Sequence, residues 1–461
     1  MANPAYLNWF LPNCIMYSEE IRALFEKLGI KVGDTISVTS GQDMQEGILM
    51  PRTGAGGSDI IVVKRKDGYN VGIKYKSGTK VSKLSESQPH HFLFPKASAS
   101  VDRSLERIAL LYTGGTIGSK VDYVSGGVYM LTKPEELMHE VPELGSIANI
   151  DVHNLMSISS EDMTYVEWQK IAEDAASSLN NGAKGVVVTL GTNTMHYTAA
   201  ALSFMLKDLN SPVVLTGAMR SSDRGSSDAF VNLICSCSIA AKSDIAEVGI
   251  CMHGSSSDSK NIFIRGTKAR KLHTSRRDAF KPVNSGPLCY VDINGSIEYA
   301  GDYRHAAKST GKVHAQTGFD PKVALLRTHP NSDPEVVDHY VKKGFKGLII
   351  EGTGMGEFPT SPSIKGLSWI SHVKDAVESG VIVGGTSQCV FGRVNHTVYR
   401  NLRVLEDIGV VNCEDMLSEV AYVKLGFLLG NYGSKKAREL LGQEIAGEIT
   451  NRIEFKKDFV E

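Results

Sequence analysis

The feature that most constrains the fold is an alternation that begins near residue 106. Short runs that are apolar throughout, such as 107–112, 185–190 and 212–216, are separated by stretches with helical periodicity. Strands that are apolar along their whole length are buried on both faces, which is typical of a parallel sheet covered by helices. We therefore expect an α/β fold, in which ligands bind at the carboxyl ends of the strands.

The same alternation predicts where the other elements lie. Further strands are expected at 151–157, 248–252, 323–327, 347–351 and 381–384. Helices are expected at about 164–180, 195–208, 226–242, 333–343, 364–378 and 414–430, followed by a charged helical tail at 434–454. The low hydrophobicity of 303–320 predicts a division into two α/β units.

The first hundred residues have a different character. Residues 18–29 predict a short amphipathic helix, with Ser18 as its N-cap. Short alternating segments separated by Gly and Asp turns occupy 31–85, which favours a small β-barrel. The expected organisation is an N-terminal extension (1–17), a helix and small barrel (18–85), a polar linker (86–105), a first α/β domain (106–305), an interdomain linker (306–320) and a second α/β domain with a helical tail (321–461).

Composition and charge exclude several classes of function. The 461 residues include 50 Lys and Arg against 51 Asp and Glu, so any contact with nucleic acid must use a local patch. No apolar run approaches ~18 residues, so no membrane-spanning helix is expected. Seven cysteines without a C-x-x-C pair argue against a disulfide framework or a zinc ribbon. We expect a cytoplasmic protein with reduced thiols and no metal site.

Three turns rich in threonine and glycine follow predicted strands directly, at 113–119, 191–195 and 216–220. Glycine lets a ligand approach the backbone closely, and threonine hydroxyls are potential nucleophiles. None of the turns matches a P-loop or a dinucleotide-binding pattern, and no G-x-S-x-G or H-E-x-x-H motif occurs. One such turn is more often structural, but three at strand ends in one domain favour an active site.

The pair Thr113–Ile117 and Gly191–Met195 resembles the two signatures of the bacterial-type L-asparaginase/glutaminase family. Within that family, the chain is similar to the D subunits of archaeal glutamyl-tRNA(Gln) amidotransferases. The segments that carry this second resemblance are 120–123, 159–163, 195–198, 271–280, 387–395 and 413–416. Residues 31–85 resemble the extra N-terminal domain of those subunits, which free asparaginases lack. The resemblance implies a two-domain L-asparaginase-like fold with a small N-terminal β-barrel.

The resemblance also implies threonine chemistry on the side-chain amide of glutamine. Thr116 corresponds to the nucleophile, and Tyr123 to a loop residue that closes over the site and orients it. Thr192 corresponds to the second active-site threonine, and Lys271 to the lysine beside it. A buried lysine loses its proton readily, so it can help to deprotonate a hydroxyl.

Substrate contacts are implied in the same way. Ser160 and Glu161 correspond to residues that hold the α-carboxylate and α-amino end of the substrate. The backbone at Ala218 would contact the amide that is cleaved, and Gly115 and Gly191 would line the same pocket.

The residues alone leave other interpretations open. Thr116 could cap the following turn, Tyr123 could be an ordinary loop aromatic, and Ser160 could be a plain helix N-cap. Lys271 lies in a basic cluster at 268–277, which is typical of a solvated face, or of a patch that faces tRNA or a partner.

Asn193 departs from the family pattern, which has aspartate at this position. The aspartate binds the substrate ammonium and completes a Thr–Lys–Asp relay. Asparagine keeps the shape and removes the charge, a change that can cost several orders of magnitude in kcat in a catalytic constellation. Three explanations stay open: an engineered inactive variant, a natural variant with a weakened site, or a charge supplied by Glu161 and Asp162.

The function that the resemblance implies is that of a glutaminase subunit, which releases ammonia for the conversion of Glu-tRNA(Gln) to Gln-tRNA(Gln). The chain itself would need no cofactor. A partner, the E subunit, would bind tRNA(Gln), ATP and Mg²⁺, and a homodimer of this chain would lie within a heterotetramer. Two alternatives are a free cytosolic L-asparaginase, which 31–85 argues against, and a non-catalytic scaffold, which Asn193 favours.

Overall fold

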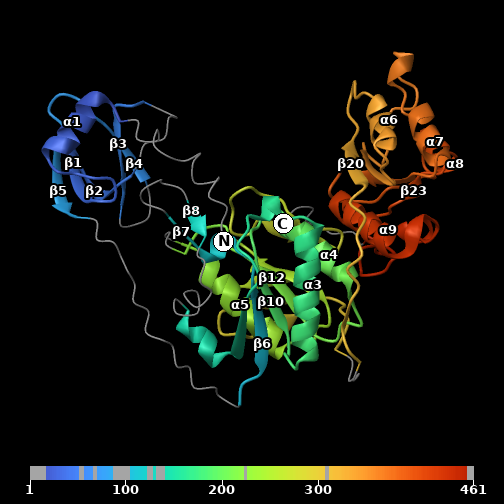
Figure 1. Cartoon of the computed structure of the whole chain (residues 1–461), viewed down its shortest axis with the longest axis horizontal. Coiled ribbons are helices and arrows are strands. Elements are labelled where there is room, and N and C mark those ends of the chain that lie inside the picture. The colour runs from blue at the N-terminus through green and yellow to red at the C-terminus, as the bar shows by residue number, and fades with distance from the viewer. Residues whose placement is uncertain are drawn as a thin grey trace.

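The structure is a computed structural model, and it describes residues 17–50, 57–65, 70–86, 104–121, 128–130, 141–222, 226–306 and 311–453. Figure 1 shows the first part of the chain in blue, a large central part in cyan to yellow, and a last part in orange and red. Within the described ranges, no helix is long and apolar enough to cross a membrane. Tyr123 lies outside the described residues.

The N-terminal part is a helix packed on five antiparallel strands. In sheet order the strands are β4 (Asn70–Lys74), β3 (Ile60–Lys64), β2 (Asp43–Leu49), β1 (Thr35–Ser40) and β5 (Lys80–Ser85). Helix α1 (Glu19–Lys27) begins after Ser18, whose side chain accepts a hydrogen bond from the Ile21 amide, as predicted for an N-cap. The expected N-terminal extension includes Tyr17, but this residue is buried in the core and its hydroxyl donates to the Met50 carbonyl.

The central part contains a sheet of eight strands. In order they are β18 (Ile297–Tyr299), β17 (Cys289–Val291), β14 (Asn261–Arg265), β13 (Val248–His253), β12 (Val213–Thr216), β10 (Val186–Thr189), β6 (Arg107–Tyr112) and β9 (Asn149–Asn154). The five strands from β13 to β9 are parallel, as predicted. The remaining three, β14, β17 and β18, are antiparallel and were not predicted. Strands β17 and β18 have only three residues each, too few to show a periodicity.

Helices cover both faces of this sheet, which explains why its strands are apolar throughout. Val186 and Val188 pack with α3 (Tyr165–Asn180) and α4 (Met195–Met205), whereas Val187 packs with α5 (Ala229–Lys242) on the other face. Figure 1 shows α5 and the pair α3 and α4 on opposite sides of the strands. The sheet therefore buries consecutive side chains in two separate cores.

A second, smaller α/β unit follows. Its four parallel strands lie in chain order: β20 (Val323–Arg327), β21 (Gly347–Gly352), β22 (Ile382–Ser387) and β23 (Val411–Asn412). Its helices are α6 (Glu335–Lys342), α7 (Ile370–Glu378), α8 (Arg400–Asp407) and α9 (Ser418–Leu441). Helix α8 was not predicted, because its sequence is mostly polar; two buried leucines, Leu402 and Leu405, hold it against the core.

Short elements complete the two units. They are the strands β7 (Ser119–Val121), β8 (Val128–Met130), β11 (Leu206–Lys207), β15 (Ala269–Lys271), β16 (Phe280–Pro282) and β19 (His314–Ala315), and the 3-10 helices η2 (Thr116–Gly118), η3 (Pro142–Ser146), η4 (Ser160–Asp162) and η5 (Lys365–Leu367). The predicted interdomain linker contains β19, which pairs with β11.

Helix α9 joins the two α/β units, because Phe427 stacks on Phe204 of α4 at 6.0 Å between ring centroids. The prediction of a helical tail at 434–454 is wrong beyond residue 441, where the chain leaves the helix. The Glu448 carboxylate accepts hydrogen bonds from the amides of Ile445 and Ala446, and this turns the chain instead.

This final segment, 442–453, folds back across both units. Glu448 forms a fully buried ion pair with Lys424 of α9, at 2.6 Å. The Thr267 hydroxyl, next to β15, donates to the Ala446 carbonyl at 3.1 Å. The Thr450 amide donates to Asp415 at 2.9 Å. The segment therefore links the strand region before β15 to the start of α9.

Candidate active site

The first Thr/Gly turn begins where β6 ends. Gly114 and Gly115 have φ values of 110° and 88°, a region that residues with side chains rarely adopt. A Cβ atom on Gly115 would lie 2.4 Å from the Gly191 nitrogen, so the turn packs against the turn after β10, backbone to backbone. Thr116 follows directly and is half-buried at the start of η2.

The second turn, after β10, packs on η4. A Cβ atom on Gly191 would lie 2.7 Å from the Ser160 hydroxyl oxygen, and the Thr194 hydroxyl donates to the Ser160 carbonyl at 2.5 Å. Ser160 is buried at this contact, while the neighbouring Glu161 is exposed. The predicted substrate-binding pair therefore lies directly beside Thr192 and Asn193.

The third turn, after β12, closes the group. A Cβ atom on Gly217 would lie 3.1 Å from the Cγ2 atom of Thr192, and Ala218 is buried next to it. The buried Asp228 carboxylate accepts hydrogen bonds from the amides of Met219 and Arg220, which fixes the turn. The three turns thus meet at the carboxyl ends of parallel strands, as predicted.

Lys271 reaches this group from β15. Its Nζ atom donates to the Thr192 hydroxyl and to the Asn193 Oδ1 atom, both at 2.9 Å. The Asn193 Nδ2 atom in turn lies 3.4 Å from the Glu161 Oε2 atom, and the Ser160 hydroxyl also lies 3.4 Å from that oxygen. A continuous polar chain therefore runs from Thr192 through Lys271, Asn193 and Glu161 to Ser160.

The electrostatics of Lys271 suit a proton acceptor. Partial burial lowers the pKa of Lys271, and the negative charge of Glu161 acts in the opposite direction. Its hydrogen-bond partners are a hydroxyl and an amide, and no carboxylate of the described ranges forms an ion pair with it. A lowered pKa increases the fraction of neutral amine, the form that can accept a proton from a hydroxyl.

Each of the other cations of the 268–277 cluster forms an ion pair with a carboxylate, which argues against a solvated cationic face. The pairs are Lys268 with Asp415, Arg270 with Glu419, Arg276 with Asp278, and Arg277 with Asp258. Lys268 and Asp415 are both almost wholly buried, with 2.7 Å between Nζ and Oδ2.

Structure and prediction therefore agree on placement. Thr192, Asn193, Lys271, Ser160 and Glu161 lie together, and the turns that carry Gly115, Thr116, Gly191 and Ala218 pack on one another. The catalytic and substrate-binding roles of these residues stay predictions. The same holds for Tyr123, which is not among the described residues.

Two groups of buried polar residues were not anticipated. Asp228 precedes α5 directly and Asn232 lies in its first turn. Asn232 holds the turn at Gly217, because its side chain donates to the Gly217 carbonyl at 2.9 Å. His196, on α4, lies beside Arg270 and Lys271, and burial lowers its pKa to about 4. Polar side chains in otherwise apolar helices are the sequence signal that marks both groups.

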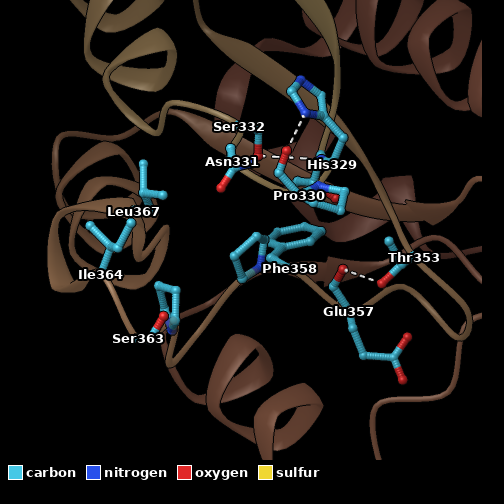
Figure 2. Close-up of a pocket in the computed structure, with 13 residues that line it drawn as sticks. His329, Pro330, Asn331, Ser332, Thr353, Glu357, Phe358, Ser363, Ile364 and Leu367 are labelled. Carbon is cyan, nitrogen blue, oxygen red and sulfur yellow. Dashed lines mark hydrogen bonds between the residues drawn. The ribbon is translucent and has the colours of Figure 1, made fainter.

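A separate pocket lies at the carboxyl ends of β20 and β21 in the second unit. Its volume is about 420 Å³, and its lining includes Thr328, His329, Glu357 and Phe358. Figure 2 shows the His329 ring hydrogen-bonded to the Pro330 carbonyl and Thr353 bonded to Glu357. None of the residues predicted for the active site lines this pocket.

Comparisons with known proteins match the three parts of the chain separately. The model "Asparaginase, N-terminal" matches residues 107–304, "Glutaminase/Asparaginase C-terminal domain" matches 322–441, and "GatD N-terminal domain" matches 30–84. Solved structures agree on the fold. The thermostable L-asparaginase from Thermococcus kodakarensis has a TM-score of 0.66 at 27% identity, over 75% of this chain and 100% of that one. L-asparaginase I from Vibrio cholerae has a TM-score of 0.65 at 29% identity, over 75% and 99%.

Relatives that match nearly the whole chain carry a different name. The D subunit of the glutamyl-tRNA(Gln) amidotransferase from Pyrococcus furiosus is 44% identical over 436 residues, which cover 93% of this chain and 97% of the relative. The D subunit from Methanopyrus kandleri is 42% identical, over 94% of each chain. These matches cover 93% and 94% of this chain, whereas each of the two L-asparaginase structures covers 75% of it. The chain belongs to the family of glutamyl-tRNA(Gln) amidotransferase D subunits, built on the two-domain asparaginase fold.

Proposed function

We propose that this chain is the glutaminase subunit of a Glu-tRNA(Gln) amidotransferase, and that it hydrolyses the side-chain amide of glutamine. The observation that carries the proposal is the contact of Lys271 with Thr192 at 2.9 Å, within an asparaginase fold that also bears the N-terminal domain of the D subunits. A lysine held on an active-site threonine by hydrogen bonding can act as a base.

In this mechanism Thr116 is the nucleophile. Its hydroxyl oxygen attacks the amide carbon, the hydroxyl proton passes toward Lys271, and the amide nitrogen leaves as ammonia after gaining a proton. Water then cleaves the resulting ester and restores Thr116. Ser160 and Glu161 hold the α-carboxylate and α-amino end of glutamine. For Tyr123 the resemblance implies a role in orienting Thr116. The tight packing of Gly115 and Gly191 leaves backbone close to the reacting amide.

The ammonia would be consumed on the E subunit of the complex, which would bind ATP, Mg²⁺ and tRNA(Gln). This chain would then need no cofactor, and a homodimer of it would form the core of a heterotetramer in the cytoplasm. The paired cations of 268–277 support this division of work, because Lys268, Arg270, Arg276 and Arg277 already have carboxylate partners. Non-specific affinity for tRNA depends on cations that are free to contact phosphates.

Ammonia release from L-glutamine tests the proposal. It is measured with the purified chain alone, and again with the E subunit, ATP, Mg²⁺ and glutamyl-tRNA(Gln). We expect release that depends on the complete set and is lost in Thr116→Ala, whereas the matched control Thr116→Ser, which keeps a hydroxyl, should retain part of it. Strong release from L-asparagine by the chain alone would instead identify a free asparaginase.

A non-catalytic scaffold is the second candidate, and Asn193 is the observation that favours it. The variant N193D separates the two. If the complete complex is silent with Asn193 and active with N193D, the chain is a disabled glutaminase; if both are silent, the chain is a scaffold.

A further inference from the structure

We propose that Glu161 supplies, through the side-chain amide of Asn193, the negative charge that positions Lys271 in this chain. Glu161 would then be a positioning residue as well as a substrate contact. The inference deepens the proposed function and rests on it, but its central prediction concerns the charge state of Lys271, which can be measured without turnover.

The orientation of the Asn193 side chain is the first argument. Its Oδ1 atom accepts from Lys271 at 2.9 Å, and its Nδ2 atom faces the Glu161 Oε2 atom at 3.4 Å. An amide accepts at one end and donates at the other, whereas an ionised carboxylate only accepts. Asparagine at 193 therefore fits between a cation and a carboxylate, and it aligns the dipole of the amide with both charges.

The second argument is that the other charged groups around Lys271 do not supply the charge. The carboxylate of Glu419 forms an ion pair with the neighbouring Arg270, with 2.8 Å between Oε1 and Nη2. The positive charges of Arg270 and Lys271 also act on His196, which stays neutral because burial lowers its pKa to about 4. Asp162 is exposed at the end of η4. Among the charged groups of the described residues, Glu161 is the carboxylate that acts on Lys271 and stabilises its ammonium form.

The third argument is the fixation of Glu161 itself. An exposed glutamate ordinarily moves freely, but here Ser160 is buried against Gly191 and its hydroxyl lies 3.4 Å from the Glu161 carboxylate. The Thr194 hydroxyl anchors the same short helix through the Ser160 carbonyl. The carboxylate is therefore held on the turn that carries Asn193, rather than on a separate flexible loop.

The test measures the reactivity of Lys271 directly. Competitive acetylation of the full chain, followed by mass spectrometry, gives the rate at which the neutral amine reacts as the pH is varied. We expect E161Q to raise the acetylation rate of Lys271 at pH 8 by about three- to tenfold, because losing the charge lowers the pKa of the lysine. The matched control D162N removes the adjacent exposed carboxylate, and it should change the rate less than about twofold.

The same change in the N193D background completes a double-mutant cycle. A carboxylate at 193 would touch Lys271 itself, so the effect of E161Q should fall below about half of its original value there. Equal effects of E161Q in both backgrounds, or an equal effect of D162N, would overturn the proposal.

Kinetics of the complete complex give an independent readout. With Asn193 present, E161Q should shift the acidic limb of the kcat profile to lower pH, because the pKa of Lys271 falls. It should also lower the plateau of kcat at higher pH, because a less basic amine accepts a proton less readily. In N193D it should mainly raise KM, because only the substrate contact is lost. If the complex proves inactive in all four forms, the proposed function fails while the acetylation cycle still decides the role of Glu161.

Discussion

Two lysines three positions apart in one strand region, Lys268 and Lys271, differ in burial and in the charge of their partners. Lys268 is almost wholly buried and contacts the carboxylate of Asp415 at 2.7 Å. Lys271 is half-buried, and it donates to the uncharged side chains of Thr192 and Asn193. Lys268 joins the two α/β units, and Lys271 faces the turns of the candidate site.

The difference lies in where the counter-charge is placed. Burial lowers the pKa of both lysines, and a carboxylate opposes this in each case. Asp415 does so in direct contact, which stabilises the ammonium ion and the junction between the units. Glu161 acts through Asn193, which leaves Lys271 free to exchange its proton. Direct pairing therefore suits a structural lysine, and an indirect charge suits a reactive one.

The largest expected effect is on catalysis. Lys271→Met should reduce ammonia release by the complete complex about a thousandfold, because the proton acceptor is lost. Its free energy of unfolding should change by less than about 1 kcal/mol, since a half-buried lysine that contacts a hydroxyl and an amide is replaced by an apolar side chain. The measurements are kcat with glutamine and urea unfolding. A variant with near-normal kcat would show that Lys271 is structural.

Lys268→Met should have the opposite profile. It leaves Asp415 buried without a cation, which should lower the free energy of unfolding by about 3–5 kcal/mol. The double variant K268M/D415N removes both charges and should recover more than half of that loss in urea unfolding. A loss no larger than that of Lys271→Met would mean that the two lysines do not differ as argued.

His196 adds a pH dependence on the same side of the site. Its pKa is about 4 in the folded chain, against an ordinary value of 6.5, so the unfolded chain binds more protons between these values. The free energy of unfolding is therefore unaffected by this histidine above about pH 6.5. It falls as the pH is lowered toward 4, by up to about 3 kcal/mol.

The variant His196→Gln should remove this dependence. Urea unfolding midpoints followed from pH 7 to 4.5 should therefore fall less steeply for H196Q than for the original chain. Parallel curves would contradict this and show that His196 is protonated in the folded state. The Glu419 Oε1 atom, 3.9 Å from the His196 Nε2 atom, would then be the group that stabilises the charge.

The smallest effect is expected at an exposed ion pair. Lys374 and Glu378 lie one turn apart on α7, 3.7 Å apart and largely exposed. Lys374→Ala should cost about 0.3 kcal/mol, because exposed pairs are screened by solvent. The buried Lys424, paired with Glu448 at 2.6 Å, is the matched contrast, and Lys424→Met should cost several times more. If both variants lose a similar amount of stability in thermal unfolding, burial does not determine how much an ion pair contributes.

Much of the fold could be predicted from the sequence, because its signal is local. The apolar run around Val187 needs both faces covered, and that requirement alone indicates a parallel sheet between helix layers. The Thr/Gly turns could also be found, since their glycines must adopt positive φ or admit a neighbouring backbone.

What could not be predicted depends on contacts between distant residues. Lys268 and Lys271 look alike in the sequence, because the partner of Lys268 lies 147 residues further along the chain. The hairpin that positions Lys271 is only three residues long on each side, too short for a periodic pattern. The charged residues beyond 441 favour a helix when they are read locally, yet Glu448 is buried in the core, where it forms an ion pair with Lys424.

The late closure of the strand region by segment 442–453 has a consequence for how the protein is made. The hydrogen bond from the Thr267 hydroxyl to the Ala446 carbonyl can form only after 179 further residues have been synthesised. A ribosome adding about 5–20 residues per second takes roughly 10–40 seconds over that distance. The strands of the central sheet, the last of which ends at Tyr299, are therefore synthesised before Asp415, the carboxylate partner of Lys268. Until residues 442–453 have been made, the strand region before β15, which positions Lys271, lacks the hydrogen bond that the Ala446 carbonyl accepts.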